Sequence, residues 1–387
     1  MKHFIILFVL LLLSGCATSD VNSVIRAATS KDPTSALKIL AQNKSIYYAQ
    51  NPDKLSKDIK SFKNFLKGIS GEWGKDNVAL PKKKEYVKYM QNYKSRAFVD
   101  FDKGIVRVET LDTKHTKKSL KNAIVTTLLL PDDPRGADLF GAKKVKLGAT
   151  PYLLGEVKDD QNKDIRYAWR ANRYADILIK KSFRTKTIKS GNRYKKVSFV
   201  EIPMVKDHAS IRVAKYKPLV EKYSKKYKVS KNLIYAIIRT ESNFNQFAVS
   251  GSGAYGLMQI IPTTAGRDAY RYVYGKKGTP SKSYLFNAEN NIKFGSAYLN
   301  ILDTRYLKGI YNPISREYCV ICSYNTGSGN VLKAFSSNRT KAKKIINSKN
   351  PSQVYRQLQS NLRYEEPKRY LKKVVNYKKD FIRLWVK

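Results

Sequence analysis

Glu241 is a carboxylate that the sequence places on an apolar helical face. It follows three isoleucines at helical spacing, Ile234, Ile237 and Ile238, in a helix expected over residues 231–241. Burial and the C-terminal end of the helix dipole both disfavour the ionised form, so the pKa of this side chain is expected to be raised. A raised pKa is what a general acid needs near neutral pH. The spacing alone leaves open that Glu241 turns into solvent or pairs with a lysine.

A glycine-rich loop and an isolated polar side chain follow this carboxylate. Residues 250–256 read SGSGAYG, a loop whose backbone can approach a ligand closely. Gln259 is the only polar side chain in the run LMQIIP, so its amide must find hydrogen-bond partners in the fold or on a substrate. Pro262 suits the first turn of a helix that runs through Thr263 and Thr264.

The cysteines and histidines show no spacing typical of a metal site. Cys319 and Cys322 are three positions apart in an apolar run, so they are expected to be small residues on the packed face of a helix. A redox-active pair is the alternative in an oxidising compartment. His3, His115 and His208 are isolated, and no metal site is predicted.

The chain begins with the layout of an export signal. A short basic start precedes an apolar run, residues 4–13, that is far shorter than the roughly 20 residues needed to span a membrane. The ending Leu-Ser-Gly-Cys resembles the lipobox of bacterial lipoproteins, which implies cleavage before Cys16 and a lipid on its sulfur. An ordinary signal peptide, or a buried start to the fold, is the alternative. Ala17 at the next position favours the outer membrane.

The charge balance indicates an acidic partner. The 387 residues include 75 Lys and Arg against 30 Asp and Glu, a net charge of +45, while a hydrophobic fraction of 42% is typical of a globular protein. Such a surface favours polyanions. Export makes nucleic acid an unexpected partner, whereas peptidoglycan carries carboxylates on its stem peptides and lies in the right compartment. A basic composition shared across a whole proteome is the alternative.

Two kinds of pattern divide the chain near residue 206. Residues 95–101 and 105–110 are expected to form a β-hairpin, with Gly104 supplying the positive φ of the turn, and a further strand is expected over 194–202. After the boundary, helical periodicity dominates. The expected helices cover residues 35–42, 55–69 and 119–130 in the first half, and 215–227 and, capped by Ser230, 231–241 in the second.

Four motifs in the second half resemble those of lytic transglycosylases with a goose-type lysozyme-like domain. They are ESNF at 241–244, GLMQIIPTTA at 256–265, SYNTGSG at 323–329 and EPKRYLKKV at 366–374. In the first half, EYVKY at 85–89 and TTLLLPDDP at 126–134 resemble the N-terminal domain of the membrane-bound lytic murein transglycosylase C family. The resemblance covers nearly the whole chain after the signal.

Carried over residue by residue, the resemblance implies that Glu241 is the catalytic glutamate. It also implies five positions that hold the sugar, orient the glutamate or shape the cleft: Ser250, Gln259, Tyr324, Asn325 and Tyr370. Two positions depart from the pattern. Thr326 stands where Gly or Ala is usual, and Asn287 stands where Asp is common, although Asn can still cap a helix.

The resemblance implies a reaction that needs one acid and no cofactor. Glu241 protonates the oxygen between MurNAc and GlcNAc, the N-acetyl group of MurNAc assists, and Glu241 then removes the proton of the MurNAc 6-hydroxyl, which gives a 1,6-anhydro end. A retaining two-carboxylate glycosidase holds its carboxylates about 5–5.5 Å apart. Here no Asp or Glu follows Glu241 until Asp268, which fits substrate assistance. Tyr255, Tyr298 and Tyr318 could stack on sugars but are more simply core.

Three other functions remain as alternatives. A lysozyme-type hydrolase would use the same fold and the same glutamate. A non-catalytic peptidoglycan-binding lipoprotein would keep the fold with a degenerate site, against which the intact Glu241 and Gln259 argue. A nucleic-acid-binding protein is contradicted by the export signal and by the lack of a recognised nucleic-acid motif.

The sequence therefore predicts an α+β protein with a small N-terminal α+β domain followed by a mainly α-helical, lysozyme-like catalytic domain. The expected segments are a lipoprotein signal peptide (1–15), a tether with the lipidated Cys16 (16–30), the accessory domain (31–206) and the transglycosylase domain (207–387). The expected partners are peptidoglycan glycan strands and, through the lipid anchor, the outer membrane on its periplasmic side. The sequence leaves the oligomeric state open.

Overall fold

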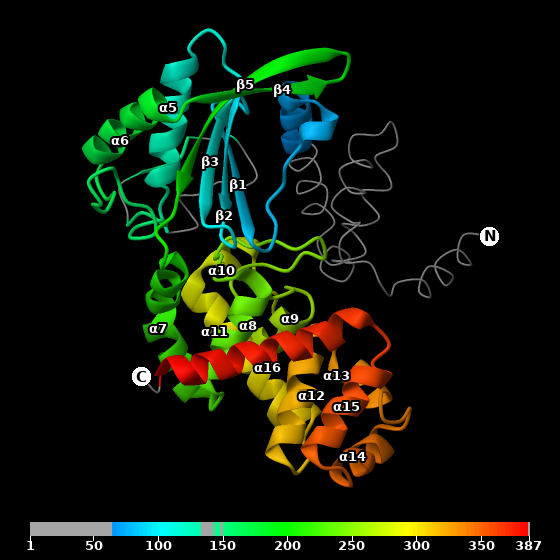
Figure 1. Ribbon diagram of the computed structural model, residues 1–387. Coiled ribbons are helices and arrows are strands. Elements are labelled where there is room, and N and C mark those ends of the chain that lie inside the picture. The colour runs from blue at the N-terminus through cyan, green and yellow to red at the C-terminus, as the bar shows by residue number, and fades with distance from the viewer. Residues whose placement is uncertain (1–63, 133–141, 143, 148–149, 386–387) are drawn as a thin grey trace, which may run out of the picture.

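The computed structural model describes residues 64–132, 142, 144–147 and 150–385 (Figure 1). The signal, Cys16, the tether and the helix expected over 35–42 lie outside the described residues. Of the helix expected over 55–69, the described part is helical and continues to residue 73.

A five-stranded antiparallel sheet organises the first half, with the strand order β1-β2-β3-β5-β4. The predicted hairpin is confirmed, since Ser95 pairs with Thr110 and Asp100 with Ile105, and Gly104 in the turn has a φ of 65°. The strands are β1 (Glu85–Met90), β2 (Ser95–Asp100), β3 (Ile105–Thr110), β4 (Arg184–Ser190) and β5 (Arg193–Pro203). The strand expected over 194–202 is thus confirmed as β5.

Helices cover both faces of this sheet (Figure 1). On one face lie α5 (Thr116–Leu128), which corresponds to the helix expected over 119–130, and α6 (Ala168–Lys181), and α5 buries an apolar stripe that includes Leu120 and Ile124. On the other face Phe65, Ile69 and Trp73 of the helix over residues 64–73 pack with Val87 and Val197 of the sheet. A short 3-10 turn, η2 (Lys75–Asn77), follows that helix.

The second half is helical, with α8 at its centre. Residues 233–238 of α8 are all buried, and α16 packs along both α8 and α12 (Figure 1). The helices are α7 (His208–Tyr227), α8 (Lys231–Ser242), α9 (Ala265–Tyr274), α10 (Lys282–Phe286), α11 (Ala288–Ile301), α12 (Pro313–Thr326), α13 (Ser328–Lys333), α14 (Arg339–Asn347), α15 (Pro351–Asn361) and α16 (Glu365–Trp385), with the π-helical turn η3 (Leu302–Tyr306) after α11. The fold class expected from the sequence is confirmed.

The two halves share an interface of apolar and buried polar groups. Tyr152 packs edge-on against Phe247 with ring centroids 4.9 Å apart. Arg212 of α7 is almost fully buried, lies 2.8 Å from Glu156, and donates hydrogen bonds of 3.1 Å to the carbonyls of Phe101 and Asn243. One hydrophobic cluster therefore runs from the sheet through α7 into the helical half.

Two local expectations need correction or refinement, and a third is confirmed. Ser230 precedes α8 as expected, but its side chain makes no capping hydrogen bond. Pro262 lies in a turn, and α9 begins later, at Ala265, because the chain is still turning away from the bridge between Tyr255 and Ile260. Cys319 and Cys322 are free, buried residues of α12, as the packed-face interpretation predicted, and burial raises the pKa of Cys319 to about 12.

Among the residues described, no helix combines the length and the apolar character needed to cross a membrane.

Candidate active site

Glu241 lies in the last turn of α8 and is 5% exposed, so it takes the buried one of the two positions that its spacing left open. The helix ends at Ser242, the residue after Glu241, because Asn243 takes a left-handed conformation with a φ of 48°. Burial is the largest influence on Glu241 and raises the pKa of its carboxyl group above the ordinary value. The side chain is therefore suited to hold a proton at a pH where an exposed glutamate would lose it.

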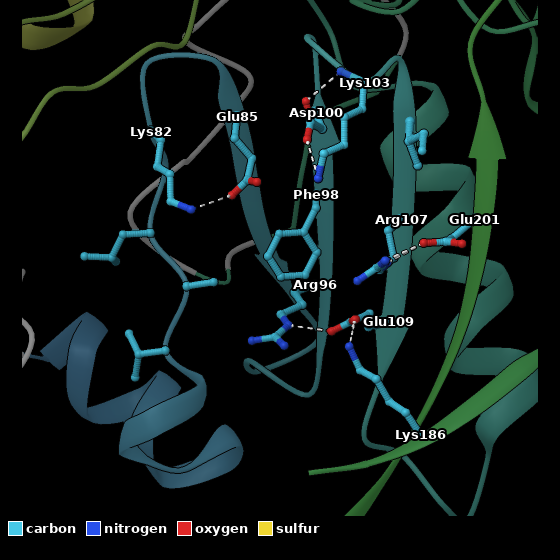
Figure 2. A pocket seen from close by; sticks show the side chains of 14 residues that line it. Lys82, Glu85, Arg96, Phe98, Asp100, Lys103, Arg107, Glu109, Lys186 and Glu201 are labelled. Carbon is cyan, nitrogen blue, oxygen red and sulfur yellow. Dashed lines mark hydrogen bonds and ion pairs between the residues drawn. The ribbon is translucent and has the colours of Figure 1, made fainter. Parts of the chain in front are cut away.

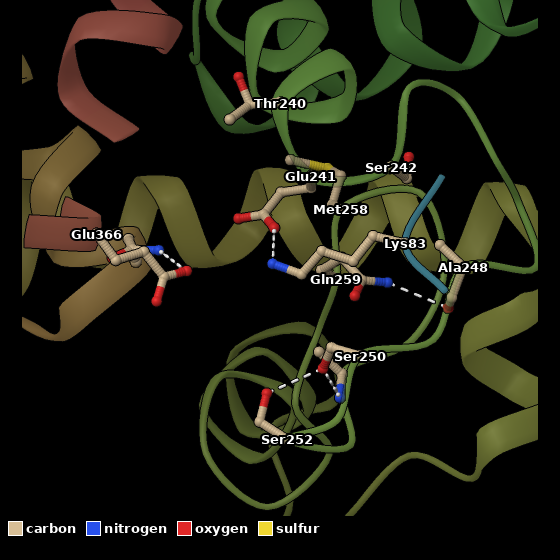
Figure 3. A network of polar contacts seen from close by, with 12 residues as sticks. Lys83, Thr240, Glu241, Ser242, Ala248, Ser250, Ser252, Met258, Gln259 and Glu366 are labelled. Atoms are coloured by element: carbon tan, nitrogen blue, oxygen red, sulfur yellow. Dashed lines mark hydrogen bonds and ion pairs between the residues drawn. The ribbon is translucent and has the colours of Figure 1, made fainter. Parts of the chain in front are cut away.

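Three other groups act on this carboxyl group, and Figure 3 shows two of them, Lys83 and Glu366. The Lys83 ammonium lies 3.4 Å from Oε2 and lowers the pKa. The Tyr370 hydroxyl also lowers the pKa, although it has no partner in ordinary hydrogen-bond geometry among the described residues. The charge of Glu366 on α16 raises the pKa. Glu241 is thus a buried acid whose proton affinity is set by its burial and by groups from two other parts of the fold, α16 and the segment that enters β1.

Gln259 is buried in the segment that follows α8, with half of its amide satisfied (Figure 3). Its Nε2 donates to the carbonyls of Ala248 at 3.1 Å and Gly256 at 3.0 Å. Its Oε1 is buried without a hydrogen-bond partner among the described residues. A buried acceptor that the fold leaves unsatisfied is available to a donor on a bound substrate.

Tyr324 and Asn325 lie at the end of α12. The Tyr324 hydroxyl donates a 2.8 Å hydrogen bond to the carbonyl of Met258, next to Gln259. Burial, followed by the negative charge of Glu241, raises the pKa of Tyr324, which therefore stays a neutral donor. Asn325 donates to Glu366 at 3.5 Å. Tyr324 holds the backbone that carries Gln259, and Asn325 links α12 to α16.

Ser250 lies in the loop between α8 and α9 (Figure 3). Its hydroxyl accepts a 3.0 Å hydrogen bond from the Ala254 amide and shares a 2.9 Å hydrogen bond with Ser252. Asn291 of α11 supports the same loop, because its Oδ1 accepts from the Met258 amide at 2.7 Å and its Nδ2 donates to the carbonyl of Tyr255 at 2.8 Å. The structure thus brings every residue of the predicted site onto α8, α12, α16 or the segment between α8 and α9.

The departures from the motif pattern and the three tyrosines have structural roles. Asn287 caps α11 by accepting from the Asn290 amide at 3.0 Å, as expected. The Asn330 side chain donates hydrogen bonds to the carbonyl and to the hydroxyl group of Thr326. The tyrosines weighed for sugar stacking each pack against another aromatic ring, with ring centroids 5.5, 5.7 and 5.3 Å apart: Tyr255 with Phe286, Tyr298 with Tyr324, and Tyr318 with Tyr355.

Two residues near Glu241 were missed by the sequence analysis. Glu366 is the first residue of the fourth motif, and its place in that motif is the sequence feature that could have identified it. Lys83 gave no signal, because it is 158 residues from Glu241 in the sequence. Its neighbourhood of consecutive lysines looks like an ordinary solvated charge run.

A separate pocket of about 430 Å³ lies on the sheet of the first half (Figure 2). Its charged side chains pair with one another, for example Arg96 with Glu109 at 2.8 Å and Lys82 with Glu85 at 3.7 Å. A pocket whose charges are already neutralised offers no evident acid or base. No cluster of three potential metal ligands occurs among the described residues.

Comparisons with known proteins cover both halves. Residues 48–215 match the family model of the membrane-bound lytic murein transglycosylase C N-terminal domain, and residues 218–347 match the transglycosylase SLT domain. Membrane-bound lytic murein transglycosylase C of Serratia proteamaculans (strain 568) is 43% identical over 336 residues, which are 86% of this chain and 92% of that protein. Its counterpart in Yersinia pestis (strain Pestoides F) is 43% identical over 82% of this chain and 88% of that protein.

Among solved structures, an inactive variant of the lytic transglycosylase Slt from Pseudomonas aeruginosa is similar, with 24% identity and a TM-score of 0.33 over 42% of this chain and 23% of that chain. The resemblance expected from the sequence motifs is confirmed by the family models and the relatives.

Proposed function

The chain belongs to the membrane-bound lytic murein transglycosylase C family, and we propose that it cleaves the β-1,4 bond between MurNAc and GlcNAc of peptidoglycan without water, with Glu241 as its only acid and base. The observation that carries this proposal is the position of Glu241. It is a buried carboxyl group with a raised pKa, and the segment that follows its helix carries Gln259, a buried amide that is only half satisfied. The chain is therefore an enzyme, a peptidoglycan lytic transglycosylase.

In the first half of the reaction, protonated Glu241 donates its proton to the bridging oxygen as the glycosidic bond breaks. The N-acetyl group of MurNAc stabilises the positive charge at its own anomeric carbon, which removes the need for a second carboxylate as nucleophile. The partnerless Oε1 of Gln259 is placed to accept a hydrogen bond from the sugar and fix its orientation.

In the second half, the Glu241 carboxylate removes the proton of the MurNAc 6-hydroxyl. That oxygen attacks the anomeric carbon and closes a 1,6-anhydro ring. Because Glu241 keeps the proton that it removed, it ends the reaction protonated, as it began. Water is not consumed, so the product end is lighter by one water than a reducing end.

A lysozyme-type hydrolase is the second candidate, and Glu366 is the observation that favours it. This residue is a second carboxylate near enough to raise the pKa of Glu241. It is exposed and accepts a hydrogen bond from Asn325. A carboxylate in that setting is better suited to orient Asn325 than to activate a water molecule.

Digestion of purified sacculi in oxygen-18 water distinguishes the candidates. A transglycosylase gives anhydro-MurNAc ends that contain no oxygen-18. A hydrolase gives reducing ends that carry the label, and a peptidoglycan-binding protein without activity gives no soluble fragments. The first result is expected.

The relatives are named as membrane-bound, and we propose that a lipid on Cys16 holds this chain at the outer membrane, facing the periplasm. The Leu-Ser-Gly-Cys ending and the Ala17 that follows it support this location. Cys16→Ser should move the protein from the membrane fraction to the soluble fraction while its activity on isolated sacculi is retained. Membrane retention of this variant would contradict the lipid anchor.

A further inference from the structure

Three consecutive lysines enter β1 of the N-terminal half, and each lies near a different carboxylate. Lys82 pairs with Glu85 at 3.7 Å and Lys84 with Asp102 at 3.0 Å, both within the N-terminal half. Lys83 instead crosses to the helical half, where its ammonium donates a 3.4 Å hydrogen bond to Oε2 of Glu241 (Figure 3).

The backbone of Lys83 is fixed in that position. Its carbonyl accepts a 3.2 Å hydrogen bond from the side chain of Asn245, which is fully buried and follows α8 by three residues. One residue later, the carbonyl of Lys84 accepts from the amide of Phe101. The segment is therefore held both by the sheet and by the chain that leaves the catalytic helix, so the contact with Glu241 is built into the interface.

The charged and titratable groups that face Glu241 come from three elements. Tyr370 and Glu366 belong to α16, and Tyr324 belongs to α12. Lys83 is the cation among these groups. Its side chain is 42% exposed, whereas that of Glu241 is 7% exposed. Lys83 therefore keeps much of its hydration while it acts on a carboxyl group that has lost nearly all of its own.

Delivery of the proton leaves a negative charge on Glu241, which Lys83 is placed to stabilise. When Glu241 protonates the leaving oxygen, a carboxylate forms in a buried site, and burial alone makes that product costly. An ammonium at hydrogen-bond distance stabilises the carboxylate and also orients its Oε2. The same contact strengthens Glu241 as an acid, because it favours loss of the proton.

We propose that Lys83, supplied by the N-terminal half, is a positioning residue of the catalytic centre that stabilises the Glu241 carboxylate formed during glycosidic bond cleavage. This inference rests on the proposed role of Glu241 as the acid. It gives the N-terminal half a direct part in the reaction, in addition to any part in binding the polymer.

The test compares pH–rate profiles of the full chain with Lys83→Met, Lys83→Arg and Lys82→Met on purified sacculi. In Lys83→Met, the rate on the low-pH plateau should fall by about fivefold, and the basic limb should move to higher pH because Glu241 holds its proton longer. Lys83→Arg keeps a cation at this position and should return the basic limb of the profile to its wild-type pH. Lys82→Met removes an adjacent lysine paired with Glu85 and should leave the profile unchanged.

A titration that needs no turnover separates this inference from the proposed function. The carboxyl carbon of Glu241, assigned in carbon-13 NMR by its loss in Glu241→Gln, should titrate at a higher pH in Lys83→Met than in the wild type. If the Glu241 carboxyl carbon titrates at the same pH in folded Lys83→Met and in the folded wild type, the inference is overturned even if the enzyme is active. If Lys83→Met does not fold, Lys83→Gln takes its place in both measurements, with the same two outcomes.

Discussion

Glu241 combines two properties that oppose each other in a folded protein, because it is buried and it must ionise once in every turnover. Burial removes water from its carboxyl group, and the effect of this burial on the pKa outweighs that of Lys83 and Tyr370. A buried acid of this kind lowers stability in exchange for proton affinity.

This cost predicts that Glu241→Gln stabilises the protein in a pH-dependent way. The folded pKa of Glu241 is raised, so the folded state binds the proton more tightly than the unfolded state, and stability falls as pH rises above about 4.3, the ordinary pKa of glutamate. The variant should be more stable than the wild type at pH 7 by about 1 kcal/mol and equally stable near pH 4. Urea unfolding at both pH values measures this, and an equal gain at both would contradict it.

The half-satisfied amide of Gln259 gives a second prediction at this scale. Gln259→Met removes two hydrogen bonds to buried carbonyls and should cost about 1–3 kcal/mol of stability. It should also raise KM, because the acceptor offered to the sugar is lost. Gln357→Met, which removes an amide bonded to the Ala334 carbonyl at 3.2 Å, is the control and should leave KM unchanged. An unaltered KM in Gln259→Met would show that its Oε1 does not meet substrate.

At the scale of elements, the segment between α8 and α9 is the part of the fold that assembles the site. Its isolated bridges join Val249 with Tyr255 and Tyr255 with Ile260, and the side chain of Asn291 on α11 is hydrogen-bonded to its backbone. Gln259 itself is in the left-handed region, with a φ of 49°. The segment has little regular structure, so its shape depends on these few contacts.

Two glycines of this segment make a matched pair. Gly256 has a φ of 77°, and a Cβ there would lie 2.3 Å from the Asn291 Nδ2 and 2.4 Å from the Leu285 carbonyl oxygen. Gly256→Ala should therefore cost about 3 kcal/mol or more and abolish activity. Gly253→Ala has a similar φ of 76° but meets no atom within 4 Å, so it should cost only about 1 kcal/mol. Equal losses in urea unfolding would contradict the role of the Asn291 contact.

The features that could be predicted from the sequence are those that depend on near neighbours in the chain. The position of Glu241 on the face of the isoleucines follows from residues within one α-helix, although that spacing alone left its burial open, and the turn at Gly104 follows from its hairpin. The start of α9 was misplaced because Pro262 is equally compatible with a first helical turn and with the turn that the Tyr255–Ile260 bridge imposes. Lys83 could not be found, since no local pattern marks a contact across 158 residues.

At the scale of the whole molecule, the chain folds around a core that both halves share. The clearest polar part of that interface is Arg212 with Glu156, each 2% exposed at its side chain. Burial raises the pKa of Glu156 to about 7, against the opposing effect of Arg212 and then of Lys215. The arrangement of Lys83 over Glu241 depends on this interface holding the two halves in register.

Removal of Arg212 alone should therefore lower the stability of the protein more than removal of the charges of both Arg212 and Glu156. Arg212→Met leaves Glu156 buried without its nearest cation and should cost about 3–5 kcal/mol. Adding Glu156→Gln should recover part of that loss, because no buried charge remains without a partner. Urea unfolding of both variants measures this, and a double variant less stable than Arg212→Met would contradict the account.

The central claim is that a single carboxylic acid performs both halves of the reaction, and the rate of release of anhydro-MurNAc fragments from sacculi tests it most directly. Glu241→Gln should lower this rate by about 100-fold or more, whereas Glu366→Gln should keep most of it. Both variants must show wild-type circular dichroism. A folded Glu366→Gln that is as inactive as Glu241→Gln would mean that two carboxylates are required, and an active Glu241→Gln would contradict the claim outright.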